Sequence, residues 1–84
     1  MDSVKITLEV IEGIEKAISN GYNRFYMNVE DMETGEGFLC ILAMNGPKYR
    51  VVYEGLFDLD ICFQVVELLE RSEIEIIDFT TRRN

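Results

Sequence analysis

The side chains of this chain that could carry covalent or metal chemistry are two cysteines and sixteen carboxylates, because the sequence has no histidine. It therefore lacks the commonest general base and metal ligand near neutral pH. Cys40 and Cys62 both lie within apolar runs. A nucleophilic thiol needs a base or a cation beside it, and structural zinc needs a cluster of Cys and His. We therefore expect two unreactive core thiols and no catalytic residue.

Neither the acidic residues nor the glycines form a recognisable ligand-binding motif. The acidic stretch 30–36 has the carboxylate density of a calcium loop, but it lacks the Gly and the final Glu that such a loop requires. The glycines at 35, 37, 46 and 55 match neither a phosphate loop nor a dinucleotide fingerprint. No spacing singles out a pair of carboxylates for acid–base catalysis. The sequence thus predicts no cofactor, no metal and no enzymatic activity.

The charge of the chain restricts its partners. Eight basic residues against sixteen acidic ones give a net charge of −8. Contacts to phosphate need clustered Lys and Arg, so neither nucleic acid nor an anionic membrane is an expected direct partner. A basic protein surface is the complementary expectation. Solubility alone also accounts for an acidic composition.

Length and cysteine usage indicate one domain in a reducing compartment. Eighty-four residues leave no room for a second domain. No apolar stretch approaches the roughly 20 residues of a membrane span, and the first residues lack the pattern of a secretory signal. Two thiols in such a chain favour the cytoplasm. A disulfide between Cys40 and Cys62 is the alternative, and it would require the two positions to face each other.

Three strands joined by short turns form the predicted centre of the fold, over residues 22–53. Residues 24–30 and 48–54 alternate apolar and polar side chains, the period-two pattern of half-buried strands. Phe38–Met44 is apolar throughout, as in an interior strand covered on both faces. Turn residues at 31–37 and 45–47 predict an antiparallel meander, with Ile41 buried at its centre.

Helical patterns flank this meander. Residues 4–20 gather their charged side chains in one narrow stripe and end at Asn20-Gly21, which predicts a helix. The β-branched residues near the start favour the alternative of a strand over 4–7 followed by a helix. Residues 59–72 predict a second helix capped by Asp58. A strand over 73–79 and a frayed tail over 80–84 complete the chain.

The predicted order is αβββαβ, a two-layer α+β sandwich in which the antiparallel meander packs with two helices. The alternative at the N-terminus gives βαβββαβ, a ferredoxin-like variant with one added strand. If both helices cover one face of the sheet, the other face is left partly apolar and aromatic. We place Tyr26 and Val52 on that face, as a homodimer interface. If the helices cover opposite faces instead, the apolar side chains on both faces of the sheet are buried.

These features predict a non-enzymatic protein-binding domain that docks its acidic surface on a basic, nucleic-acid-binding protein and blocks it. Immunity proteins, antitoxins and the inhibitors that phages and mobile elements encode, anti-CRISPR proteins among them, belong to this general class. The expected contacts are the carboxylates at the tip of the predicted hairpin: Glu30, Asp31, Glu33 and Glu36. The next candidates are carboxylates on the two helices: Glu9, Glu12, Asp60 and Glu67. A structural homo-oligomeric module and a small-molecule sensor remain as alternative functions.

Overall fold

The structure is a computed structural model that describes residues 3–31 and 36–83, with side chains at 6–30 and 36–77. Its element order is αβββαβ, which confirms the predicted α+β sandwich. The elements are α1 (Ser3–Ser19), β1 (Arg24–Asp31), β2 (Gly37–Asn45), β3 (Lys48–Leu56), α2 (Leu59–Arg71) and β4 (Glu75–Arg83).

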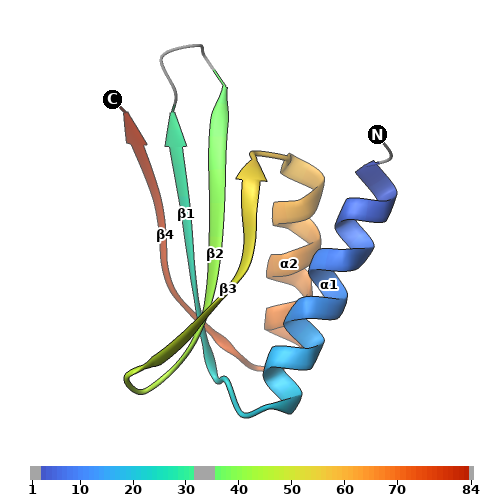
Figure 1. The fold of residues 1–84 in the computed structure, drawn as a ribbon, viewed down its shortest axis with the longest axis vertical. Helices are drawn as coiled ribbons and strands as arrows, with labels where there is room; N and C mark the ends of the chain where they lie inside the picture. The colour runs from blue at the N-terminus through green and yellow to red at the C-terminus, as the bar shows by residue number, and fades with distance from the viewer. Residues whose placement is uncertain (1–2, 32–35, 84) are drawn as a thin grey trace.

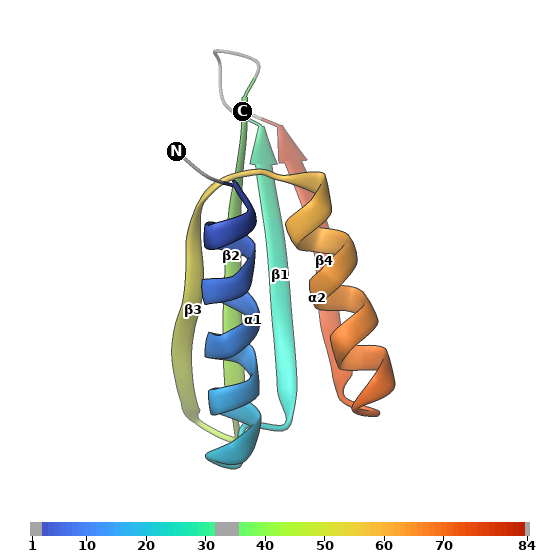
Figure 2. The same cartoon turned by 90° about the vertical axis from the view of Figure 1, so that its right-hand side faces the viewer.

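The four strands form one mixed sheet in the order β3-β2-β1-β4. β2 pairs antiparallel with both β1 and β3, as the meander predicts, whereas β4 pairs parallel with β1. A parallel neighbour requires a crossover connection, and α2 provides it. Both helices lie on the same face of the sheet (Figures 1 and 2). The opposite face is covered by neither helix.

The N-terminal segment is a helix, so the alternative with a strand over residues 4–7 is wrong. Val10, Ile14 and Ala17 follow helical spacing and are buried against the sheet. Gly21 ends α1 with a φ of 92°. The N–H of Tyr22 donates to the Ala17 carbonyl at 3.1 Å, the bond of a Schellman cap. Packing of the buried stripe thus outweighs the β propensity of the branched residues.

Helix α2 is capped at both ends by its own sequence. The Asp58 carboxylate accepts a hydrogen bond from the N–H of Asp60 at 2.8 Å, as predicted for an N-cap. At the other end, Glu73 has a φ of 56°, a left-handed conformation that normally favours glycine. This conformation lets the N–H of Ile74 donate to the Leu69 carbonyl at 2.9 Å. Both helix ends are therefore fixed relative to the sheet.

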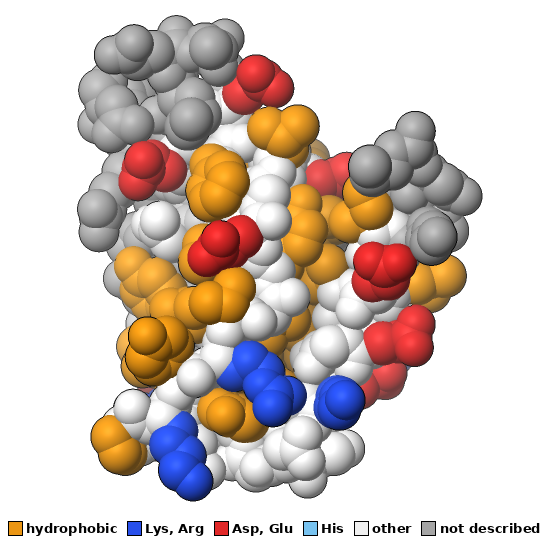
Figure 3. Space-filling model, viewed as in Figure 1, with side chains coloured by type: hydrophobic (Ala, Val, Ile, Leu, Met, Phe, Trp, Pro, Cys, Tyr) orange, Lys and Arg blue, Asp and Glu red, His pale blue; other side chains and the backbone are white. Residues whose placement is uncertain are grey.

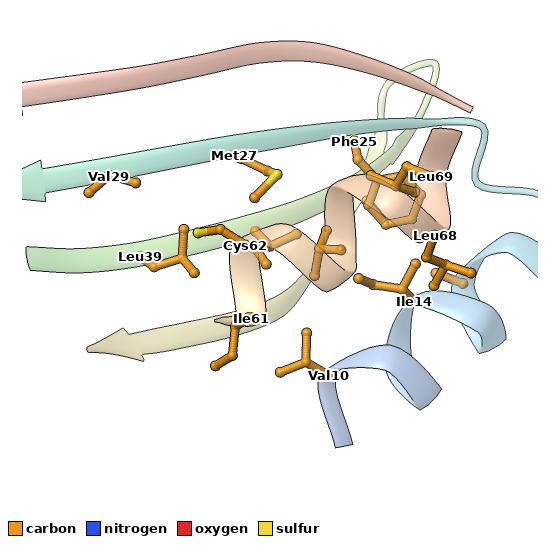
Figure 4. Packing of buried hydrophobic residues seen from close by; sticks show 14 residues of the cluster. Val10, Ile14, Phe25, Met27, Val29, Leu39, Ile61, Cys62, Leu68 and Leu69 are labelled. Carbon is orange, nitrogen blue, oxygen red and sulfur yellow. The ribbon is translucent and has the colours of Figure 1, made fainter. Parts of the chain in front are cut away.

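The core lies between the helices and one face of β1 and β2 (Figure 4). The strands contribute alternate, fully or nearly buried residues: Phe25, Met27, Val29, Leu39, Ile41 and Ala43. Helix α2 contributes Ile61, Cys62, Val65, Leu68 and Leu69. Ile41 is buried in the interior strand β2, as predicted.

Two sequence-based expectations about the sheet are wrong. β4 does not end at residue 79, because its backbone stays paired with β1 up to Arg83, opposite Asp31. Residues 80–83 were expected to form a frayed tail because they are polar. β1 is long enough to pair with them along its whole length. β2 is interior, but this chain covers only one of its faces, since both helices lie on the same side (Figure 2).

Candidate functional site

The two thiols lie on opposite faces of the sheet and are both free. Cys62 is buried in α2, but Cys40 alternates with the inward-facing Leu39 and Ile41 and is only half-buried, so its assignment to the core is wrong. Burial, reinforced by the Glu54 carboxylate, raises the pKa of the Cys40 thiol. Burial, reinforced by the Asp58 carboxylate, also raises the pKa of the Cys62 thiol. Both thiols are therefore poor nucleophiles at neutral pH.

The described residues contain neither a cluster that could bind a metal nor a helix that could span a membrane. Within the parts of the chain that the structure describes, no three His, Cys, Asp or Glu side chains gather where they could hold a metal ion. In those same parts, neither helix combines the length and the apolar character needed to cross a membrane.

The first exposed surface is the sheet face opposite the helices, here called the open face. Its apolar residues alternate with the core residues of the same strands: Tyr26, Phe38, Cys40, Leu42, Met44, Tyr49 and Val51. Tyr49 and Val51 on the edge strand β3 are 68% and 46% exposed. Tyr26 and Leu42, which are paired across β1 and β2, are half-buried by their neighbours in the sheet. This face is thus an apolar surface without a cover.

Val52 does not belong to the open face, so this part of the predicted homodimer interface is wrong. Ile41 pairs with Tyr53 and Leu42 pairs with Val51, which leaves Val52 as the extra residue of a β-bulge. The side chain of Val52 packs on the core instead. A Cβ atom built on Gly13 of α1 would lie 3.4 Å from its Cγ1 atom. A shift of one residue at the bulge thus moved the side chain to the helix side of the sheet.

The second exposed surface is the connection between β3 and α2, here called the junction patch. It presents four large apolar side chains that belong to one short segment and have exposed fractions between 38% and 65%: Leu56 (60% exposed), Phe57 (38%), Leu59 (56%) and Phe63 (65%). Asp58 and Asp60 are interleaved with them in sequence. A pocket of about 250 Å³ opens beside this segment, and Ile6 and Tyr53 line its other side.

The junction patch contacts the start of β2, which follows the acidic hairpin. The N–H of Phe57 donates a 2.8 Å hydrogen bond to the Gly37 carbonyl. The start of β2 and the start of α2 therefore lie at the same end of the molecule (Figure 1). Of the four predicted hairpin contacts, Glu36 is exposed and Glu30 is half-buried, while the side chains of Asp31 and Glu33 lie outside the described residues.

Charge is distributed unevenly between the two ends of the molecule. All four helix carboxylates named as further candidates are exposed: Glu9, Glu12, Asp60 and Glu67. The described Lys and Arg side chains lie instead at the end opposite the junction, in the last helical turns or at the starts of strands: Lys16, Arg24, Lys48, Arg50 and Arg71. Figure 3 shows basic side chains gathered at that lower end. The junction patch is therefore apolar and flanked by carboxylates.

Comparison with protein-family models, with curated proteins and with solved structures found no match. The surfaces of this chain must therefore be interpreted from their own chemistry. Sequence reasoning missed the junction patch because it assigned the apolar residues of 59–72 to a mostly buried helix. The available signal was the alternation of apolar and acidic residues over 57–60, which a helix start alone does not require.

Proposed function

We propose that this chain is a non-enzymatic protein-binding domain that docks its junction end on a basic protein and blocks that protein's own binding surface. The observation that carries the proposal is the junction patch, where Leu59 and Phe63, one turn apart on α2, and Phe57 just before the helix are exposed beside the carboxylate of Asp60. Isolated exposed apolar residues are ordinary, but a group with an acidic surround is typical of interaction sites.

The two kinds of side chain serve different steps of binding. Phe57 and Phe63 are large and rigid, and aromatic residues of this kind dominate the binding energy when a partner covers them. Asp60, in the first turn of α2, and Glu67, one turn beyond Phe63, give the surrounding surface a negative potential. Such a potential speeds encounter with a basic partner and disfavours acidic ones.

The acidic hairpin extends this surface in the proposal. Glu36 directly precedes Gly37, whose carbonyl accepts the hydrogen bond from Phe57, so this exposed glutamate adjoins the segment in contact with the junction patch. Nucleic-acid-binding proteins present the clustered Lys and Arg that would complement such a surface. A protein docked there would cover those cations, and its access to nucleic acid would be blocked.

The alternative of a small-molecule sensor has less support. The junction pocket of about 250 Å³ is smaller than the roughly 300–1,000 Å³ typical of ligand sites. A second hollow, of about 370 Å³, is lined mainly by polar and charged side chains (Ile11, Gln64, Glu67 and Arg71), whereas ligand sites are predominantly apolar. A pocket of this size fits one or two side chains of a partner protein. We therefore assign it to protein contact.

The test removes the apolar contacts without changing charge. A partner isolated with the wild-type chain is purified, and its affinity is measured for the double variant Leu59→Ser/Phe63→Ser. We expect binding to weaken by about 3 kcal/mol or more, because two large side chains no longer enter the interface. The matched control is Tyr49→Ser/Val51→Ser on the open face, which should bind that partner as the wild type does. Equal affinity of the wild type and the junction variant would refute the proposal.

A further inference from the structure

We propose that the open face is a homodimer interface, in which two copies of this chain pack sheet against sheet about a two-fold axis. Leu56 of the junction patch borders this surface, because it pairs with Phe38, whereas Phe57, Leu59 and Phe63 lie outside the sheet. The inference stands whether or not the proposed partner exists. An isologous pair of this kind buries the same residues on both copies.

The residues of β2 carry the first step of the argument. Cys40, Leu42 and Met44 are as apolar as the core residues between them, although no helix of this chain covers them. Strands with one solvated face normally alternate apolar and polar residues, whereas continuous apolar strands are covered on both sides. A second copy would provide the missing cover for β2.

The size of the open face fits a stable dimer. Four strands about 4.8 Å apart, each rising about 3.3 Å per residue over nine residues, make a face of roughly 600 Å² in projection. The uneven surface of side chains makes the accessible area larger than this projection. Stable protein interfaces bury about 800 Å² on each partner. With roughly 600 Å² on each copy, a dimer would bury about 1,200 Å² in total, at the lower end of the range for stable interfaces.

The distribution of charge selects a second copy over the basic partner for this face. The described charged residues of the open face lie at strand ends or on an edge strand: Arg24, Glu30, Glu54 and Glu75. Tyr26, Leu42 and Val51, which are paired across β1, β2 and β3, form an apolar row through its centre. Packing sheet against sheet also points the acidic helix layers of both copies outward, so their mutual repulsion is small.

Dimerisation would leave Phe57, Leu59 and Phe63 of the junction patch accessible, because they lie outside the strands that form the open face. The assembly would then present two identical junction surfaces. A partner with a single docking site would bind each copy independently, so loss of the dimer would leave its affinity unchanged.

The experiment measures mass and interface contact together. Sedimentation velocity should show a concentration-dependent dimer for the wild type and for Leu59→Ser/Phe63→Ser, but a dimer about a hundredfold weaker for Tyr49→Ser/Val51→Ser. In a Cys62→Ala background, Cys40 on the open face is the sole thiol of the chain. Its alkylation should slow as the dimer forms. Circular dichroism melting confirms that each variant is folded.

Two results would overturn the inference. One is a wild-type chain that stays monomeric up to high micromolar concentration. The other is a dimer in which Cys40 reacts at the same rate as in the monomer, because the copies would then associate through another surface. Either result leaves the proposed function standing if the junction variant still loses its partner, so the two proposals fail separately.

Discussion

The backbone N–H of Phe57 donates a hydrogen bond to the carbonyl oxygen of Gly37, with 2.8 Å between the nitrogen and the oxygen. Through this contact the start of β2 and the start of α2 hold each other in place. A Cβ atom built on Gly37 would lie only 2.8 Å from the Cβ of Phe57, so a glycine is needed for the close approach. The start of β2, which follows Glu36, and Phe57 of the junction patch are thus fixed as neighbours.

Replacing Gly37 by Ala should separate these two segments. The added methyl group overlaps Phe57 and forces a backbone shift, which should lower the free energy of unfolding by about 1–3 kcal/mol. Chemical denaturation measures this loss. In a Phe57→Gly background the cost of Gly37→Ala should become small, because the overlapping atoms are gone. Equal costs in the two backgrounds would show that the contact does not hold the segments together.

The C-terminal cap of α2 offers a stabilising substitution. Glu73 adopts a φ of 56°, which strains any residue with a side chain, so Glu73→Gly should raise the free energy of unfolding by about 0.5–1 kcal/mol. The matched control is Glu67→Gly within α2, which should lower the free energy of unfolding by about 1 kcal/mol. If both glycines destabilise the protein equally, the left-handed cap is not present in solution.

The buried centre of β2 should dominate stability. Ile41 is fully buried, so Ile41→Ala should lower the free energy of unfolding by about 2–5 kcal/mol. Leu59→Ala, on the exposed start of α2, should change it by about 0.5 kcal/mol at most. Urea denaturation of both variants checks the contrast. Similar losses would place Ile41 outside the core.

Alkaline pH should destabilise the fold through Cys62. Burial raises the pKa of this thiol above its ordinary value of 9.0, so its contribution to stability is complete below pH 9.0. The contribution is lost as the pH rises through the pKa of the folded state, because only the unfolded chain ionises readily. The free energy of unfolding should therefore fall above pH 9.0, and less steeply in Cys62→Ala. Parallel pH profiles of the two proteins would contradict this explanation.

The sequence predicts the elements well because their signals are local. The helix over Ser3–Ser19 follows from the spacing of its buried residues and the stop at Gly21, and β2 follows from its continuous apolar run. The face to which a side chain points is less local. Val52 changes face because of a β-bulge opposite β2, and no pattern in β3 alone reveals such an insertion.

The candidate surfaces were predicted only in part for a related reason. Helix patterns show which residues are apolar, but not that both helices cover the same face of the sheet. The exposure of Phe63 and the uncovered side of β2 are consequences of that arrangement. The acidic character of the surface followed from composition, whereas its position beside the junction patch depends on the contact between Phe57 and Gly37.

The most direct test of the proposed function is the association rate of the basic partner with two variants of equal charge. One neutralises carboxylates of the helix surface, as Glu9→Gln/Asp60→Asn/Glu67→Gln, and the other neutralises carboxylates near the opposite end, as Glu70→Gln/Glu73→Gln/Glu75→Gln. We predict that the first slows association about tenfold at low salt, with the difference fading near 1 M salt, and that the second leaves the rate close to that of the wild type. Equal rates for the two variants would contradict docking through the acidic junction end.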